Sequence, residues 1–293
     1  MPGARPIAGL SALLDRHDAF IFDLWGVLHD GAHCMPGVLP ALQQLRAAGK
    51  KIGIMSNSPR PAEAAAANIG RYGLRPDTYD LLLTSGQLTF EALRDRPDAW
   101  LRALGHDCLH IGPGHEFAFY APLGLRKSDD PAAASFIFVT GVGGENAALE
   151  DFQPLLNECL HRRLPLLCAN PDRAVLKEGR RRLAPGSIAQ HYAAMGGDVR
   201  AGYGKPHPEI FTRMLRQLAV PATRALMIGD NLDTDIAGAH GVDMPSLWIY
   251  GGVHRPELTP EPDFNAVLAP GLLHDFLAHR AARPDYMLPQ VVF

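Results

Sequence analysis

The stretch Phe20–Gly31, FIFDLWGVLHDG, decides the fold. It opens with a short apolar run that ends at a carboxylate, Asp23. A run of this kind predicts a buried strand over Ala19–Phe22 that carries Asp23 at its carboxyl end. Two residues later, where a second carboxylate would complete a catalytic pair, the chain has Trp25. The stretch therefore predicts a strand that brings one aspartate to a sheet edge, and it raises the question of what a tryptophan does beside it.

Apolar runs and helical spacing alternate through most of the chain. We expect further strands over Ile52–Met55, Leu81–Thr84, Phe136–Thr140, Leu164–Ala169, Ala225–Ile228 and Ser246–Tyr250. We expect helices at Leu39, Leu42 and Leu45, over Pro61–Ile69, Gln87–Leu93 and Asn146–Arg162, along Ile210, Phe211, Met214, Leu215 and Leu218, and just after Asn231. This alternation predicts an α/β fold with a doubly wound, Rossmann-like parallel sheet.

The middle of the chain differs from its two ends. It is rich in expected turns, at Gly112–Gly114, Gly141–Gly144 and Pro185–Gly186. We therefore expect a second α/β module inserted into the first. The expected core domain comprises residues 1–104 and 200–293, and the inserted domain comprises residues 105–199.

Composition excludes several classes of function. The net charge of the 293 residues is −3, which gives no basic field for nucleic acid or an anionic membrane. No apolar run approaches the roughly 20 residues of a spanning helix, and the N-terminus lacks the apolar segment of a signal peptide. The four cysteines are far apart and form no CxxC pair, which is typical of reduced thiols. These features predict a soluble cytoplasmic protein.

Polar residues follow several of the expected strands, and ligands bind at such strand ends in open α/β sheets. They are Asp23, the pair Ser56 and Asn57, and Asp230 with Asp233 and Asp235; Lys205 lies in a turn before a helix that Pro206 is expected to start. Each alone is typical of a helix cap, a turn or a solvated side chain. Together, Asp23 and Asp230 would form an oxygen-rich site for Mg²⁺, with Lys205 and Ser56 facing the same point. Such a site is suited to holding and transferring a phosphoryl group.

The same motifs give the chain a family resemblance. DLWGVLHDG, MSNSPR, GKPHPEIF and GDNLDTDIAGA, with the shorter stretches MPG, TSGQLT, IGPG, CANPD and APGSIAQ, resemble the haloacid dehalogenase-like hydrolase superfamily and, within it, the NagD-like subfamily. The last two long motifs, at their separation, are the specific ones. The resemblance implies a Mg²⁺-dependent phosphatase for a small phosphorylated metabolite, with a cap domain inserted between the serine and lysine motifs.

The resemblance also implies residue roles. Asp23 would be the nucleophile, which forms an aspartyl-phosphate, and a metal ligand; Asp230 and the backbone carbonyl of Trp25 would complete the ligand set, and Asp235 would orient it. Ser56, Lys205 and the backbone of Asn57 would bind phosphate, and Arg60 would reach the substrate. Asn170, Asp172 and Arg173 of the CANPD stretch either face the substrate or form a plain turn.

Trp25 departs from the family pattern, because phosphatases of the superfamily place a second aspartate there to protonate the leaving group. An indole N–H only donates hydrogen bonds and cannot shuttle protons. Three hypotheses stay open: a phosphatase with an atypical proton donor such as His29 or Asp30, a phospho-ligand-binding protein with little catalysis, and a metal-independent 2-haloacid dehalogenase. The apolar tail RPDYMLPQVVF either packs on the core or serves a homodimer contact.

Overall fold

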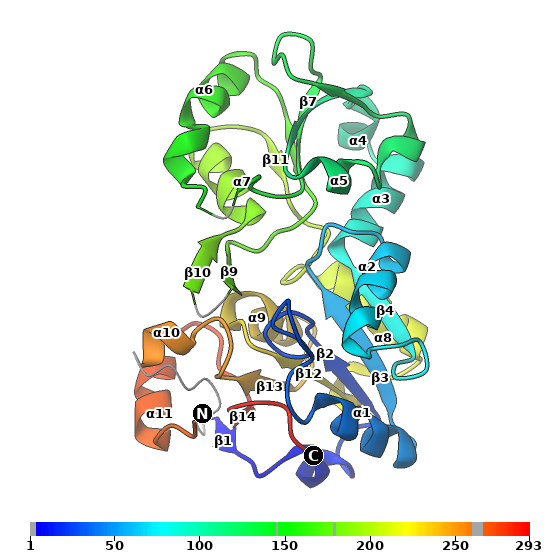
Figure 1. Cartoon of the computed structure of the whole chain (residues 1–293), viewed down its shortest axis with the longest axis vertical. Coiled ribbons are helices and arrows are strands. Elements are labelled where there is room, and N and C mark those ends of the chain that lie inside the picture. Colours follow the sequence, from blue (N-terminus) through cyan, green and yellow to red (C-terminus); the bar gives the residue numbers. More distant parts are fainter. Residues whose placement is uncertain (1–3, 145, 178–179, 260–265) are drawn as a thin grey trace.

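The computed structural model describes residues 4–144, 146–177, 180–259 and 266–293. Figure 1 shows two parts stacked along the long axis, with both chain ends in the lower part. Within the described residues the lower part is built on a parallel sheet of seven strands. In spatial order they are β1 (Arg5–Pro6), β14 (Tyr286–Leu288), β13 (Ser246–Ile249), β12 (Ala225–Gly229), β2 (Ala19–Phe22), β3 (Lys51–Ser56) and β4 (Leu81–Thr84). The predicted Rossmann-like α/β core is confirmed.

Both faces of this sheet are covered, which explains the uninterrupted apolar runs of its strands. Successive residues of a strand point to opposite faces, so Ile21 joins one hydrophobic cluster while Phe20 and Phe22 join another. Helix α8 (Pro208–Leu218) adds its apolar side to the first cluster, and α1 (Val38–Ala47) adds its apolar side to the second.

Short helices complete the lower part. They are η1 (Leu10–Leu13), α2 (Ala62–Ile69), η2 (Gly70–Tyr72), η5 (Ala222–Arg224), the π-helical turn η6 (Leu232–Ile236), α9 (Ala237–His240), α10 (Arg255–Leu258) and α11 (Pro270–Ala278). Helix α3 (Ser85–Asp95) follows β4 and runs toward the upper part in Figure 1.

The upper part contains a second parallel sheet. Its strands, in spatial order, are β11 (Val199–Arg200), β8 (Leu166–Cys168), β7 (Phe136–Val139), β5 (Asp107–Ile111) and β6 (Arg126–Ser128). Its helices are α4 (Ala99–Ala103), α5 (Gly114–Phe117), η3 (Ala121–Leu123), η4 (Leu149–Phe152), α6 (Gln153–His161) and α7 (Pro185–Ala194). An antiparallel pair, β9 (Ala174–Lys177) and β10 (Arg180–Leu183), lies between the two parts in Figure 1.

The two parts share a hydrophobic core. One cluster contains Met55 and Leu83 from the lower sheet, Leu88 from α3, and Phe136 and Phe138 from the upper sheet. Because these side chains pack in a single cluster, the base of the upper part is fixed on the lower part. We propose the division into a core domain (residues 1–104 and 200–293) and a cap domain (residues 105–199) on this arrangement of the two sheets, with α4 and the end of β11 at the boundary.

Three local predictions differ from the structure, and in each case the observed helix has a proline in its first turn. The helix expected over Asn146–Arg162 is a 3₁₀ turn followed by α6, which has a proline in its first turn. Pro185–Gly186, expected as a turn, begins α7. The helix expected to start at Pro206 starts at Pro208. Proline is favoured at the first helical position, where its missing N–H has no intrahelical partner to lose.

The C-terminal tail packs on the core, as one of the two hypotheses stated. Val291 is buried, and the backbone N–H of Leu10 donates to the Val292 carbonyl at 3.0 Å. Cys34, Cys108, Cys159 and Cys168 are free thiols. Among the described residues, no helix has the length and apolar character needed to cross a membrane.

Candidate active site

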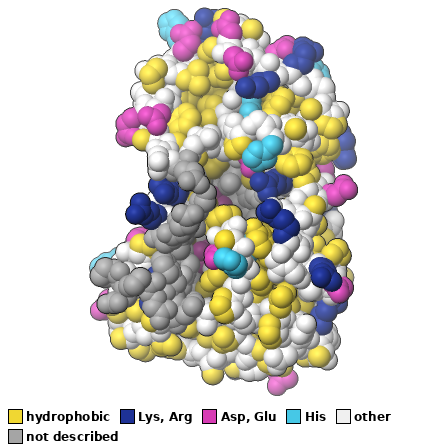
Figure 2. Space-filling view, viewed as in Figure 1, with side chains coloured by type: hydrophobic (Ala, Val, Ile, Leu, Met, Phe, Trp, Pro, Cys, Tyr) yellow, Lys and Arg dark blue, Asp and Glu magenta, His cyan; other side chains and the backbone are white. Residues whose placement is uncertain are grey.

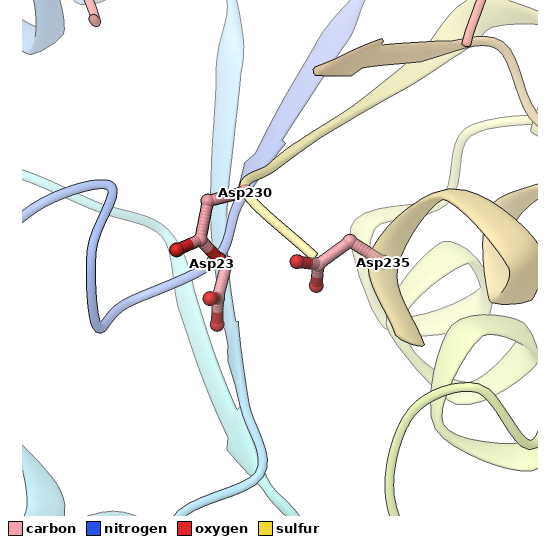
Figure 3. Close-up of side chains that lie close together, drawn as sticks. All are labelled: Asp23, Asp230 and Asp235. Carbon is pink, nitrogen blue, oxygen red and sulfur yellow. The ribbon is translucent and has the colours of Figure 1, made fainter. Parts of the chain in front are cut away.

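Three aspartates converge at the carboxyl edge of the lower sheet. Asp23 directly follows β2 and Asp230 directly follows the neighbouring strand β12, while Asp235 comes from the turn η6. Figure 3 shows their carboxylates near one another. One oxygen from each lies within 4.8 Å of the others. The parallel pairing of β2 with β12 therefore brings together carboxylates more than 200 residues apart in the sequence.

Glycines make this close approach possible. A Cβ on Gly26, whose φ is +84°, would lie 2.3 Å from Asp230 Oδ2. A Cβ on Gly252 would lie 2.2 Å from the same oxygen, and a Cβ on Gly229 would lie 2.2 Å from Asp235. Side chains at these positions would displace the carboxylates, so glycine is required for backbone to pack this tightly around the site.

Backbone donors hold two of the carboxylates in place. The Val253 N–H donates to Asp230 Oδ2 at 2.8 Å, and the Asn231 N–H donates to Asp235 Oδ2 at 3.1 Å. The indole N–H of Trp248 donates to the Asp230 carbonyl at 2.9 Å. The orientation of the acidic cluster is thus fixed by the surrounding loops.

Lys205 is the cation of this cluster. Its Nζ donates to Asp23 Oδ1 at 2.5 Å and to Asp235 Oδ1 at 2.6 Å, and its side chain is 2% exposed. Burial acts to lower the pKa of Lys205, but Asp23 and Asp235 outweigh it and raise the pKa. Burial raises the pKa of Asp235 to about 7, and burial together with the neighbouring carboxylates raises the pKa of Asp230 well above its ordinary value.

These residues fit a divalent metal ion. The raised pKa values of Asp230 and Asp235 show that one lysine does not offset three buried carboxylates, and buried charge is costly unless it is paired. A cation among Asp23, Asp230 and Asp235 would offset that charge, and a donor set of carboxylate oxygens suits a hard ion such as Mg²⁺.

The phosphate-binding candidates lie at the next strand ends. Ser56 ends β3, and its hydroxyl accepts a hydrogen bond from the Ser58 N–H at 3.1 Å. The side chain of Asn57 bonds to the backbone on both sides of Lys205. Arg60 points toward the upper part, where its Nη2 lies 3.8 Å from Glu116 Oε1. Nothing in the sequence pattern indicated Glu116, because its partner becomes a neighbour only through the fold.

Trp25 belongs to a packed aromatic group. Its ring lies edge-on to His29 at 5.2 Å, and His29 stacks on Tyr72 at 4.6 Å. A Cβ on Gly31 would lie 2.3 Å from the Trp25 ring, and the Tyr72 hydroxyl donates to the Gly31 carbonyl at 2.8 Å. The indole thus fills space between the loop after β2 and the region of Tyr72.

The two candidate proton donors, His29 and Asp30, accept hydrogen bonds from backbone N–H groups of their own loop. His29 Nδ1 accepts from the Gly31 N–H at 2.9 Å, and burial lowers the pKa of His29 to about 4, so the ring is neutral at pH 7. Asp30 is exposed and accepts from the N–H groups of Ala32 and His33. Its small burial acts to raise its pKa, but these backbone bonds lower it, so Asp30 is a carboxylate at pH 7.

The cap reaches the core through the loop after β8. Asp172 Oδ1 accepts from Asn57 Nδ2 at 2.8 Å, and Arg173 forms an ion pair with Asp233 at 2.7 Å. Asp233 is therefore directed at the cap and lies outside the acidic cluster of the described residues. On the face drawn in Figure 2, arginine and lysine side chains lie near the level where the upper and lower parts meet.

Comparison with known proteins agrees with this architecture. Models described as haloacid dehalogenase-like hydrolase match residues 20–125 and 123–243, and a HAD-hydrolase-like model matches residues 202–291. Human chronophin is 31% identical over 287 residues, which cover 93% of this chain and 92% of chronophin. The chain belongs to the haloacid dehalogenase-like hydrolase family.

Two further relatives support its place among the NagD-like members. A crystal structure of a haloacid dehalogenase-like hydrolase from Brucella suis 1330 has a TM-score of 0.80 and 30% identity, with all of both chains covered. D-glycerol 3-phosphate phosphatase of Mycobacterium tuberculosis is 29% identical over 84% of this chain and 66% of its own length. A structure of the glycerol phosphate phosphatase from that organism in complex with magnesium has a TM-score of 0.62 and 24% identity, and the match covers 94% of this chain and 75% of that chain. This family member is a hydrolase of the phosphatase kind.

Proposed function

We propose that the chain is a Mg²⁺-dependent phosphatase that hydrolyses a small phosphate monoester through an aspartyl-phosphate on Asp23. The observation that carries the proposal is the position of Lys205 Nζ, 2.5 Å from Asp23 and 2.6 Å from Asp235, beside the cluster completed by Asp230. A fixed ammonium next to one carboxylate of an acidic group suits the stabilisation of a phosphoryl group during transfer.

The reaction proceeds in two displacements. A carboxylate oxygen of Asp23 attacks phosphorus, the bond from phosphorus to the ester oxygen breaks, and the alcohol leaves after that oxygen takes up a proton. Water then attacks the phosphorus of the aspartyl-phosphate and gives up a proton to solvent, which breaks the bond to Asp23 and releases inorganic phosphate. Lys205 and Ser56 bind phosphoryl oxygens together with the backbone of Asn57, and Arg60 contacts the rest of the substrate.

Asp23, Asp230 and the backbone carbonyl of Trp25 would hold the metal ion, and Asp235 would orient this ligand set. When bound, Mg²⁺ supplies positive charge that offsets the repulsion between the phosphate and the carboxylate nucleophile. Structures of the related glycerol phosphate phosphatase with magnesium and with calcium support a divalent cation at this site.

Trp25 sets the expected substrate preference. Loss of a positioned general acid typically slows a reaction by about 10²–10⁴-fold. This cost falls on alkyl phosphates, whose leaving groups need a proton, and much less on aryl phosphates with acidic leaving groups. We therefore propose an enzyme that turns over 4-nitrophenyl phosphate faster than an alkyl ester such as glycerol 3-phosphate.

A cleft at the boundary between cap and core has the size of a small-molecule site. This cleft of about 500 Å³ opens where the cap meets the core and is lined by Arg173, Arg181 and Arg182 from the cap and by Asp233 from the core. Cleft volumes of this size suit small molecules. Arg173 pairs with Asp233 and Arg181 with Glu257, so among the described residues Arg182 is the arginine of this lining left to favour an anion.

The test is release of inorganic phosphate from a panel of small phosphoesters, with Mg²⁺ and with EDTA, for wild type and Asp23→Asn. We expect release that requires Mg²⁺ and is lost in Asp23→Asn. Tight binding of phosphoesters without any turnover would instead support the second candidate, a phospho-ligand-binding protein, which the lack of a second carboxylate at position 25 favours. Metal-independent release of halide from a 2-haloacid would support a dehalogenase.

A further inference from the structure

The side-chain amide of Asn57 joins two segments that are far apart in the sequence. Its Oδ1 accepts from the Lys205 N–H at 2.7 Å, and its Nδ2 donates to the Lys205 carbonyl at 2.9 Å. The other hydrogen of Nδ2 goes to Asp172 Oδ1 at 2.8 Å. Asn57 is 2% exposed, so water does not compete strongly for these bonds. The amide therefore brackets the backbone of Lys205 on one side and contacts a carboxylate of the cap on the other.

Asp172 itself is held in a fixed place. The Gly186 N–H at the start of α7 donates to the Asp172 carbonyl at 2.8 Å, and a Cβ on Gly186 would lie 2.1 Å from the Pro171 carbonyl oxygen. On the core side, the Ser85 hydroxyl donates to the Ala169 carbonyl at 2.6 Å. The loop is thus tied to α7 of the cap and to α3 of the core, and it presents the Asp172 carboxylate at a defined point.

The position of Gly204 shows how closely the loop after β8 approaches the turn that carries Lys205. A Cβ on Gly204 would lie 2.4 Å from Asn57 Oδ1 and 2.8 Å from Pro171 Cγ. The residue directly before Lys205 therefore packs against both Asn57 and the cap loop. A shift of the cap loop or of Asn57 would move the turn that carries Lys205.

These contacts form one path from the cap to the nucleophile. We propose that Asp172 is a positioning residue of the cap, which orients the Asn57 amide and thereby sets where Lys205 places its ammonium relative to Asp23. The inference rests on the proposed function, in which Lys205 binds the phosphoryl group. A carboxylate acceptor makes a stronger bond to the Asn57 amide than a neutral acceptor would, which suits a role in orientation.

The kinetic test uses 4-nitrophenyl phosphate with Mg²⁺. We expect Asp172→Ala to lower kcat roughly 10-fold, the order expected for one lost bond to a charged group, with little change in KM. Asp172→Asn should retain most of the activity, because its Oδ1 still accepts from Asn57. The control is Asp107→Ala, which removes an exposed cap aspartate paired with Arg126 and should leave kcat unchanged.

A double variant tests whether Asp172 acts through Asn57. If it does, Asn57→Ala with Asp172→Ala is no slower than Asn57→Ala alone, because the path is already broken. Multiplied losses would overturn the proposal. So would an Asp172→Asn variant as slow as Asp172→Ala with one limb of the pH profile missing, since that result would assign proton transfer to Asp172.

Amide hydrogen exchange gives a readout that needs no activity. The Lys205 N–H donates to Asn57 Oδ1, so Asp172→Ala should speed exchange at Lys205 and leave β12 unchanged. Unaltered exchange at Lys205 would contradict the positioning role. If wild type hydrolyses no phosphoester, the proposed function fails, while the exchange experiment still decides whether Asp172 positions Lys205.

Discussion

Lys205 Nζ lies 2.6 Å from Asp235 Oδ1, and both side chains are almost completely buried. Each charge is tolerable in the interior only because the other is present. The Lys205 ammonium therefore affects both the stability of the fold and the proposed reaction, because it also contacts Asp23.

Lys205→Met should destabilise the metal-free protein strongly. Removing one partner of a buried ion pair leaves uncompensated charge and costs about 3–5 kcal/mol. The measurement is urea unfolding in EDTA, with Lys127→Met as control, because Lys127 forms an exposed pair with Asp129. Equal, small losses in the two variants would contradict the structural role of Lys205.

The metal-free protein should lose part of its stability as pH rises. Burial raises the pKa of Asp235 from its ordinary 3.8 to about 7, so the folded state keeps this proton to higher pH than the unfolded state does. The resulting stabilisation is complete below about pH 4 and is lost as pH rises through about 7. The free energy of unfolding of wild type, minus that of Asp235→Asn, should fall across this window in EDTA.

This difference removes the contribution of buried histidines, whose effect on stability has the opposite sign. Burial lowers the pKa values of His17, His29 and His110 to about 4, so these groups make the protein more stable as pH rises toward 6.5. They are present in both proteins and cancel in the difference. A difference that rises with pH would contradict the assigned environment of Asp235.

Mg²⁺ should raise the melting temperature of wild type but not of Asp230→Asn. A ligand that binds only the folded state stabilises it by mass action, and Asp230 supplies one of the clustered oxygens. Asp233→Asn is the matched control from the same loop, since Asp233 pairs with Arg173 of the cap. Loss of the Mg²⁺ effect in Asp233→Asn, or its survival in Asp230→Asn, would relocate the metal site.

Trp25→Asp should raise turnover of alkyl phosphates relative to 4-nitrophenyl phosphate, because it supplies the missing acid. It should also destabilise the protein by about 0.5–3 kcal/mol, because the contacts with His29 and Gly31 are lost. Trp25→Phe controls for packing and should leave the substrate ratio unchanged. An unchanged ratio in Trp25→Asp would show that another group already moves the proton.

The positions of site residues can be predicted best from the sequence where a single polar residue follows an apolar strand. Asp23 and Asp230 follow apolar runs that form adjacent parallel strands, so the rule that ligands bind at carboxyl ends places them correctly. Gly229 and Lys205 belong to motifs specific enough to recognise without a structure. For such residues, local pattern and fold class together determine position.

The sequence does not predict contacts that depend on how the cap sits on the core. Asp172 stands in a short Asn-Pro-Asp stretch that is equally typical of a turn, and only the docked loop brings it to Asn57. Glu116 beside Arg60 and Tyr72 behind His29 are likewise set by packing between distant segments. Periodicity records which face of an element is buried, and it carries no information about partners across an interface.

The most direct test of the central claim is to trap the phosphorylated enzyme. Wild type with Mg²⁺ and a phosphoester labelled at phosphorus is quenched in acid during the first turnover, digested and sequenced by mass spectrometry. We predict one phosphoryl group on the peptide with Asp23, absent in Asp23→Asn. Phosphate release at the normal rate from Asp23→Asn, or a label on another residue, would contradict the assignment of Asp23 as nucleophile.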